Sequence, residues 1–313
     1  MRHVLTAVAL AAAAAILLVA LPASGRPVRG APKCRVLPAS NHWNLRVDKL
    51  PVLPNSDAMI EGIGAGDTLH PDFGSGTYEG RPIGIPFTTV SKRQKRVKVS
   101  FDYADESDPG PYPIPRNAPI EGGADSDGDR HVIVVDRDRC VLYELYDAHP
   151  QDGGASWRAG SGAIFNLRSN RVRPAGWTSA DAAGLPILPG LARYEEVKAG
   201  KIDHALRFTV ARTRRAYIYP ARHFASSATD PDLPAMGQRL RLKASFDTSG
   251  YPRQARVVLN ALKRYGMILA DNGSDWFISG APSKGWDNDE LNALKGVEGS
   301  NFEVVDSARL PRP

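Results

Sequence analysis

The chain has 313 residues, with 40 Lys and Arg against 34 Asp and Glu and a formal net charge of +6. This composition excludes a coiled coil, a collagen and a disulfide-dense miniprotein, and the 34 acidic residues argue against a dedicated nucleic-acid binder. The 29 Gly and 25 Pro residues predict many turns, and therefore short strands rather than long helices.

Residues 1–25 have the three parts of a secretory signal peptide: a basic start, an apolar run over residues 4–21 and small residues before a cleavage point. An uncleaved anchor is the alternative, because a run of this length could just span a bilayer. We expect cleavage, and a mature protein that is secreted (extracellular or periplasmic) and not stably inserted in a membrane. Residues 26–313 are expected to form a single globular β-rich domain, with residues 26–33 disordered.

The chain has two cysteines, Cys34 and Cys140. In an oxidising compartment they predict a disulfide rather than a metal pair or a nucleophile, and two buried thiols are the alternative. A bridge that closes so long a loop contributes at most about 4–5 kcal/mol. It would attach the N-terminal arm to a strand.

In chain order, strands are predicted over residues 96–103, 131–136, 141–147, 163–167, 204–210, 216–219, 239–246, 267–270, 276–279 and 302–305. At 96–103, 204–210 and 239–246 apolar and polar residues alternate, which predicts half-buried strands. Helices are predicted after Pro252 and after Asp287, which has a capping-box-like Glu290. Because strands dominate without βαβ alternation, the expected fold is mostly β: an antiparallel β-sandwich or jelly-roll-like domain with a few helical insertions.

The sharpest prediction concerns residues 129–147, which read as a hairpin around the turn residues 136–139. With a two- or four-residue loop, the numbers of opposed residues sum to 275, so His131 faces Glu144 and Asp129 faces Tyr146. A carboxylate beside an imidazole can tune it as a base, or the two can be metal ligands. An ordinary ion pair at a sheet margin is the non-functional alternative.

Two loops and one further histidine supply other candidate site residues. Asp105 and Glu106 belong to an acidic loop at a strand end, and Asp271, Asp275 and Trp276 lie in a polar loop with an aromatic ring. Paired carboxylates are what glycoside hydrolysis requires, and an indole face suits a sugar. Simple solvation of the acids and a tight turn are the alternatives. His223, beside an arginine after a strand, is a third candidate.

No cofactor is predicted, although calcium is weighed for one segment. Residues 125–129 place acids at alternate positions, as calcium loops do, but the glycine is fourth instead of sixth. No HxxxH, HxH or HExxH spacing occurs, so no standard zinc pattern supports a metal.

Four stretches, YADESDPGPYPIP, DRHVIVVDRDRCVLYELYDA, GWTSADAAGLPILPGL and ADNGSDWFISGAP, resemble a family of secreted bacterial proteins of uncharacterised function. The resemblance covers nearly all of the mature chain and implies an intact domain. It carries no activity or catalytic residue.

These patterns together favour a secreted carbohydrate-active protein, a glycoside hydrolase or polysaccharide lyase acting on a polysaccharide or other glycan. His131, Glu144 and His223 are the predicted proton-transfer residues. Substrate contacts are predicted for Asp105, Glu106, Tyr146, Asp271, Asp275 and Trp276. The alternatives are a non-catalytic glycan-binding or cell-envelope-associated module and, third, a metal-dependent extracellular enzyme.

Overall fold

The structure is a computed structural model that describes residues 25–313, so all but the last residue of the predicted signal peptide lies outside it. The chain has 26% of its residues in strands and 18% in helices. The expectation of a mostly β protein is therefore confirmed. Within residues 25–313, no helix combines the length and the apolar character needed to cross a bilayer.

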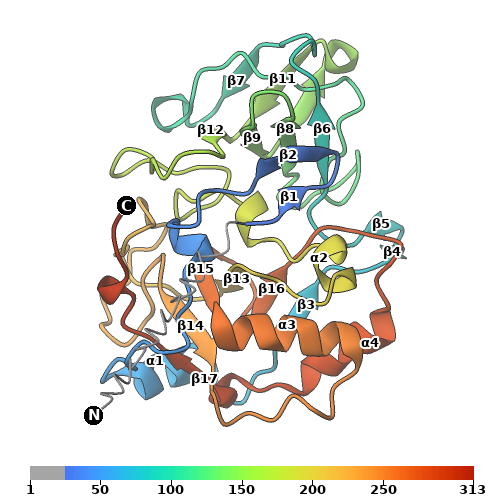
Figure 1. Ribbon diagram of the computed structural model, residues 1–313. Coiled ribbons are helices and arrows are strands. Elements are labelled where there is room, and N and C mark those ends of the chain that lie inside the picture. Colours follow the sequence, from blue (N-terminus) through green and yellow to red (C-terminus); the bar gives the residue numbers. More distant parts are fainter. Residues whose placement is uncertain (1–24) are drawn as a thin grey trace, which may run out of the picture.

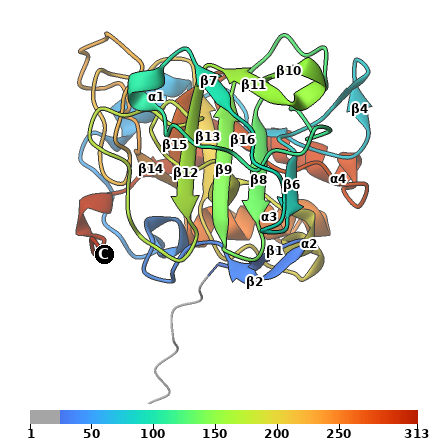
Figure 2. The same ribbon diagram turned by 90° about the horizontal axis from the view of Figure 1, so that it is seen from above.

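Two larger sheets organise the molecule (Figures 1 and 2). The four-stranded sheet has the order β12-β9-β8-β6, with β6 (Phe87–Val90), β8 (Val132–Asp136), β9 (Val141–Tyr146) and β12 (Ser161–Asn166). The six-stranded sheet has the order β17-β14-β15-β13-β16-β3, with β3 (His70–Asp72), β13 (Leu206–Val210), β14 (Arg239–Leu242), β15 (Met267–Asn272), β16 (Phe277–Ser279) and β17 (Phe302–Val304).

Three smaller sheets complete the β structure of the described residues. A three-stranded sheet contains β7 (Val99–Phe101), β10 (His149–Gln151) and β11 (Ser156–Ala159). The two hairpins are β1 (Pro27–Val28) with β2 (Ala31–Arg35) and β4 (Thr77–Tyr78) with β5 (Arg81–Pro82). Residues 26–33 are thus not disordered as expected, because β1 and β2 pair and bury Val28 and Ala31.

The strands are not purely antiparallel, contrary to expectation. Parallel pairs are β6 with β8, β7 with β11, β13 with β15 and β3 with β16. Each of these pairs joins strands distant in the sequence, and local patterns carry no information on such partners.

Helices α1 (Ser56–Ile63), α2 (Tyr194–Lys198), α3 (Arg253–Arg264) and α4 (Asn288–Asn292) border the six-stranded sheet. The helix predicted after Pro252 is α3, which packs against β14. The one predicted after Asp287 is α4, whose N-terminus the Asp287 side chain caps by accepting from the N–H groups of Asp289 and Glu290.

The four-stranded sheet is buried on both faces. One face, with Ile133 and Leu142, belongs to the same core as Phe208 and Ile268 of the six-stranded sheet. The opposite face contributes to a second core around Trp157. Burial on both sides explains why β8 reads as a continuous apolar run instead of an alternating one.

Four predicted strands differ from the observed ones. Strands β13 and β14 are buried along their whole length on both faces, so the half-buried expectation for 204–210 and for 239–242 is wrong. Residues 243–246 lie beyond the end of β14 and are partly or fully exposed. Residues 96–103 form only the short strand β7 with one isolated bridge at Val97. Residues 216–219 form no strand but a single bridge at Tyr217.

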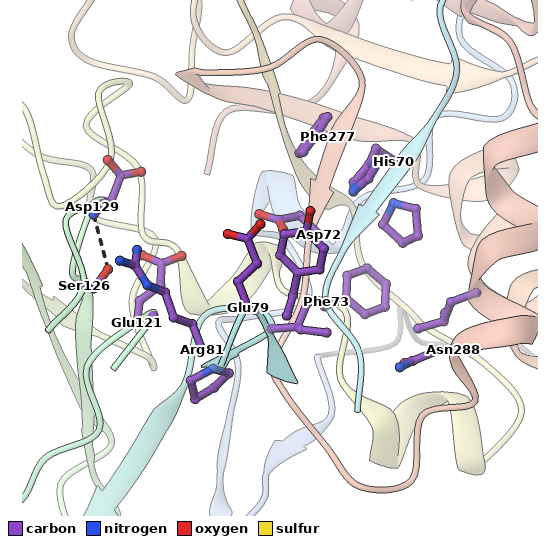
Figure 3. Close-up of a pocket in the computed structure, with 18 of the residues that line it drawn as sticks. His70, Asp72, Phe73, Glu79, Arg81, Glu121, Ser126, Asp129, Phe277 and Asn288 are labelled. Carbon is purple, nitrogen blue, oxygen red and sulfur yellow. Dashed lines mark hydrogen bonds between the residues drawn. The ribbon is translucent and has the colours of Figure 1, made fainter. Parts of the chain in front are cut away.

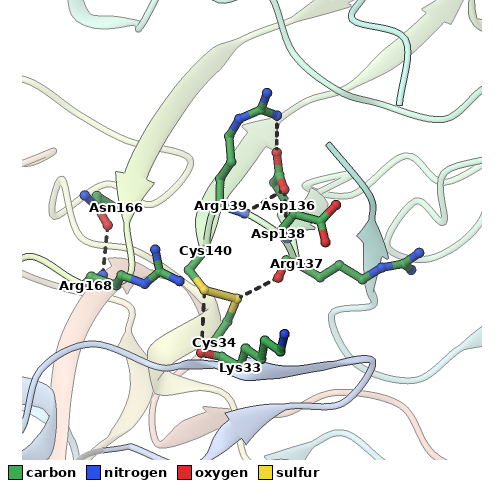
Figure 4. The surroundings of a disulfide bond; sticks show 9 residues. All are labelled: Lys33, Cys34, Asp136, Arg137, Asp138, Arg139, Cys140, Asn166 and Arg168. Carbon is green, nitrogen blue, oxygen red and sulfur yellow. Dashed lines mark hydrogen bonds and ion pairs between the residues drawn. A yellow bond between two sulfur atoms is a disulfide. The ribbon is translucent and has the colours of Figure 1, made fainter. Parts of the chain in front are cut away.

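The β8–β9 hairpin exists, but its register is shifted by two residues from the prediction. Asp136 pairs with Val141, and Glu144 therefore pairs with Ile133 and not with His131. The side chain of Asp136 accepts the N–H groups of Asp138 and Arg139, and thereby organises the four-residue turn (Figure 4). The shift is even, so the predicted residues still share one face of the sheet.

The predicted disulfide between Cys34 and Cys140 is present (Figure 4). It joins β2 to the end of the hairpin turn, and both cysteines are fully buried. A disulfide fits an oxidising compartment. Secretion itself stays a prediction.

Candidate functional site

Two hollows open beside each other, and Asp129 lines both of them. The first, here named the Asp271 pocket, has a volume of about 380 Å³ and is lined from both large sheets, by Tyr146 at the end of β9 and Asp271 at the end of β15. The second, the Glu121 cleft, has a volume of about 750 Å³. Figure 3 shows Glu121 and Asp129 on one side of this cleft and His70 with Phe277 on the other.

The Asp271 pocket brings together four of the predicted site residues: Glu106, Tyr146, His223 and Asp271. They come from a 3-10 turn (Ala104–Glu106), from two strand ends and from the loop after residue 220. The pocket therefore brings together residues that are far apart in the sequence: Glu106 and Asp271 are separated by 165 positions.

A buried arginine lies between two carboxyl groups, one of which, Asp271, lines this pocket. Arg207 of β13 donates to both oxygens of Asp181, with Nε–Oδ2 at 2.9 Å and Nη2–Oδ1 at 2.7 Å. Its Nη2 lies 3.3 Å from Oδ2 of Asp271. Arg207 and Asp181 are buried, whereas the Asp271 side chain remains 21% exposed.

One guanidinium cannot neutralise two adjacent carboxylates, so a proton is favoured on one of them. Burial, together with the neighbouring Asp181 carboxylate, raises the pKa of Asp271 well above its usual value, although Arg207 lowers it. Asp271 therefore keeps its proton to a higher pH than an ordinary carboxyl group.

Glu106 and His223 form a second group on the wall of this pocket. His223 Nδ1 lies 2.8 Å from the carbonyl oxygen of Ala182, which requires an N–H at that nitrogen. The other nitrogen, Nε2, lies 3.8 Å from Oε2 of Glu106. That same oxygen accepts the Thr178 N–H at 3.0 Å. In the neutral imidazole, Nε2 is therefore free to accept a proton.

Two tyrosines supply the aromatic surface. Tyr103 is 56% exposed and Tyr146 is half-buried, and both line the Asp271 pocket. Phenol rings offer an apolar face and a hydroxyl group, a combination that suits sugar rings.

His131 and Glu144 do not form a pair. His131 is buried, and its ring contacts Glu121 Oε2 through Nδ1 at 2.5 Å and the Ala180 carbonyl through Nε2 at 3.0 Å. Burial alone would lower the pKa of His131, but the Glu121 carboxylate raises it to about 9.

Glu144 is fully buried and accepts the backbone N–H groups of Ile187 and Leu188, each at 2.9 Å. Burial raises its pKa to about 7, against these two hydrogen bonds. It lines neither hollow, so its contacts are those of a side chain that anchors a loop.

The remaining predicted residues lie outside both hollows. Asp105 is exposed in the 3-10 turn. Asp275 accepts the Ala211 N–H at 2.8 Å. Trp276 is completely buried, donates its indole N–H to Gly64 O and stacks between Phe208 and Phe302. It is a core residue and offers no face to a sugar.

At the segment weighed for calcium, two backbone carbonyl oxygens accept hydrogen bonds from an arginine. The Arg130 guanidinium Nη1 donates to the carbonyl oxygens of Ala124 and Ser126, at 2.9 and 2.7 Å. These carbonyls are the kind of ligand that a calcium loop turns toward its ion.

Sequence reasoning missed Arg207, Asp181 and Glu121. Arg207 occupies a polar position in an alternating strand, where the pattern indicates a solvent-facing side chain. Asp181 and Glu121 lie in segments without regular structure, and no spacing in the sequence marks them.

No family model, no curated protein and no solved structure matches this chain.

Proposed function

We propose that this protein is a glycan-cleaving enzyme whose catalytic centre is the Asp271 pocket. The observation that carries the proposal is the Asp271 carboxyl group, which lines the pocket and lies beside the Asp181–Arg207 ion pair, where burial and the Asp181 carboxylate raise its pKa. A proton donor and a separate base around one pocket are what hydrolysis of a glycosidic bond needs.

In this mechanism Asp271 gives its proton to the glycosidic oxygen as the bond to the sugar carbon breaks. Glu106, with His223 beside it, takes a proton from the water that attacks that carbon. The exposed ring of Tyr103 and the half-buried Tyr146 hold the sugar. Since the base activates water and forms no covalent bond, the product should have inverted anomeric configuration.

The test is to incubate the purified protein with a panel of polysaccharides, with and without EDTA, and to measure new reducing ends. On the cleaved substrate, Asp271→Asn should lower kcat at least about 100-fold, because it cannot donate the proton. The matched control is Asp275→Asn, four residues away and outside the pocket, which should keep the wild-type rate. Absence of turnover on every glycan, or full activity of Asp271→Asn, would contradict the proposal.

A glycan-binding module is the second candidate, favoured by the exposed Tyr103 ring at the pocket. Binding of a glycan that is weakened by Tyr103→Ala, with no turnover of that glycan, would establish this candidate in place of the enzyme.

We also infer that the two large sheets, which share one core, form a β-sandwich. An experimental structure with the two sheets about 10 Å apart would support this classification.

A further inference from the structure

One histidine and two carboxylates converge at the border of the Asp271 pocket and the Glu121 cleft. A ligand atom from each of Glu121, Asp129 and His131 lies within 4.8 Å of the other two. The burial is graded, because His131 is buried, Glu121 is partly exposed and Asp129 is exposed. These three residues, named here the His131 triad, come from two segments that meet just before β8.

A hydrogen bond to the backbone, at the ring nitrogen that does not face Glu121, fixes the orientation of the His131 ring. Its Nε2 faces the Ala180 carbonyl oxygen at 3.0 Å, so this nitrogen carries the hydrogen. In the neutral ring Nδ1 then presents a lone pair toward the Glu121 carboxylate, 2.5 Å away. At 2.5 Å the nitrogen and the carboxylate oxygen share a proton, and a cation that binds between them must displace it. A ring N–H bound to a backbone carbonyl is also the usual support behind a metal-binding histidine.

We propose that the His131 triad binds a divalent cation of the zinc or manganese type, with Nδ1 of His131 and one oxygen each from Glu121 and Asp129 as ligands. An imidazole nitrogen with two carboxylates suits these ions, whereas calcium prefers oxygen ligands alone. Neighbouring ligands around a tetrahedral zinc ion lie roughly 3.5 Å apart, given bonds of about 2.1 Å. The Nδ1–Oε2 distance of 2.5 Å must therefore widen by about 1 Å when the cation displaces the shared proton.

The position of the triad leaves the cation accessible. Asp129 lines both hollows, so a water or a substrate oxygen can reach the coordination position that the protein does not fill. Three protein ligands with one open position are typical of catalytic rather than structural zinc sites. A cation here would lie beside the Asp271 pocket and could hold a substrate that extends from one hollow to the other.

Isothermal titration calorimetry on the EDTA-treated protein tests this site, with ZnCl2, MnCl2 and CaCl2 as the probes. We expect saturable 1:1 binding of zinc or manganese, and weaker or undetectable binding of calcium. Asp129→Asn should weaken zinc or manganese binding at least tenfold, because it removes a charged ligand. Asp129 is exposed, so the substitution leaves the core intact.

Asp125→Asn is the matched control, since Asp125 is an exposed acid of the same loop that is not part of the triad. It should bind as the wild type does. The proposal is overturned if the wild type shows no saturable 1:1 binding of zinc or manganese, or if Asp129→Asn binds as tightly as the control. The titration contains no glycan, so its outcome is independent of whether the Asp271 pocket cleaves one.

Discussion

The charges of Asp181, Arg207 and Asp271 leave one of the two carboxyl groups poorly compensated. Arg207 satisfies Asp181 with two short hydrogen bonds and reaches Asp271 with one longer contact. An ionised Asp271 would therefore be a poorly compensated charge in a largely buried place, which costs free energy. The protonated form avoids this cost.

This arrangement predicts how stability depends on pH. The pKa of Asp271 is raised in the folded protein, so the native state binds a proton that the unfolded state has already lost. The contribution of Asp271 to the free energy of unfolding is therefore fully present below about pH 4 and is lost as pH rises through the folded pKa. Asp271→Asn, which is neutral at every pH, should be more stable than the wild type above that range, by about 1.4 kcal/mol for each unit of raised pKa.

Urea unfolding of both proteins between pH 4 and pH 9 measures this difference. The gain of the variant should grow with pH and then level off. Asp125→Asn serves as the reference, because Asp125 is an exposed acid outside this network. A constant difference between Asp271→Asn and wild type across this range would show that Asp271 titrates normally.

At the level of elements, close packing of the three-stranded sheet on the four-stranded sheet depends on a glycine. A methyl group on Gly162 of β12 would lie 2.5 Å from the Phe101 ring and 2.7 Å from the Tyr112 hydroxyl. Tyr112 is completely buried and its hydroxyl donates to Asp108 O. Neither ring can move without disturbing the second core.

Gly162→Ala should therefore lower the free energy of unfolding by about 1–3 kcal/mol, the usual range for overpacking a core. Gly250→Ala is the control, since nothing lies within 4 Å of its added methyl group, and it should be neutral or slightly stabilising. Thermal unfolding of the two variants separates the effects. Equal melting temperatures would mean that the two layers are less closely packed than described.

The β8–β9 hairpin and helix α3 show what a sequence can specify by itself. Both were predictable because their signals are local: turn residues between apolar runs, and a proline and a glycine at the two ends of an amphipathic segment. The register was not predictable, because it depends on Asp136 accepting two N–H groups and on Cys140 adopting a positive φ of 55°. A four-residue turn can begin at Asp136 or at Arg137, and the pattern of apolar residues is compatible with both.

The candidate site was partly predictable for the same reason. Glu106, Tyr146, His223 and Asp271 follow strands or lie at their ends, and side chains there tend to surround a common pocket. Trp276 was misread because an aromatic residue in a polar loop resembles a sugar platform, while its burial between Phe208 and Phe302 depends on non-local packing. Arg207 was missed because a buried ion pair leaves no periodic signal.

On the scale of the whole molecule, the N-terminal arm (residues 25–45) is attached to the rest of the fold at several points. Cys34 of β2 is bonded to Cys140, and the nearby Val36 is part of the main core. Farther along, Arg239 of the six-stranded sheet donates to the carbonyl oxygens of His42 and Leu45. The arm thus touches both large sheets, and the disulfide is its covalent attachment to the four-stranded one.

Replacing both cysteines with alanine should therefore destabilise the protein without changing its fold. The bridge spans a sequence separation of 106, for which the chain-entropy model gives about 4–5 kcal/mol, and measured losses for native disulfides are about 2–5 kcal/mol. Urea unfolding of the double variant should show a lower midpoint. The wild type treated with reductant should approach the same midpoint, whereas the variant should be insensitive to reductant. Equal midpoints of variant and oxidised wild type would mean that the buried contacts of Val36 and the Arg239 hydrogen bonds hold the arm without the disulfide.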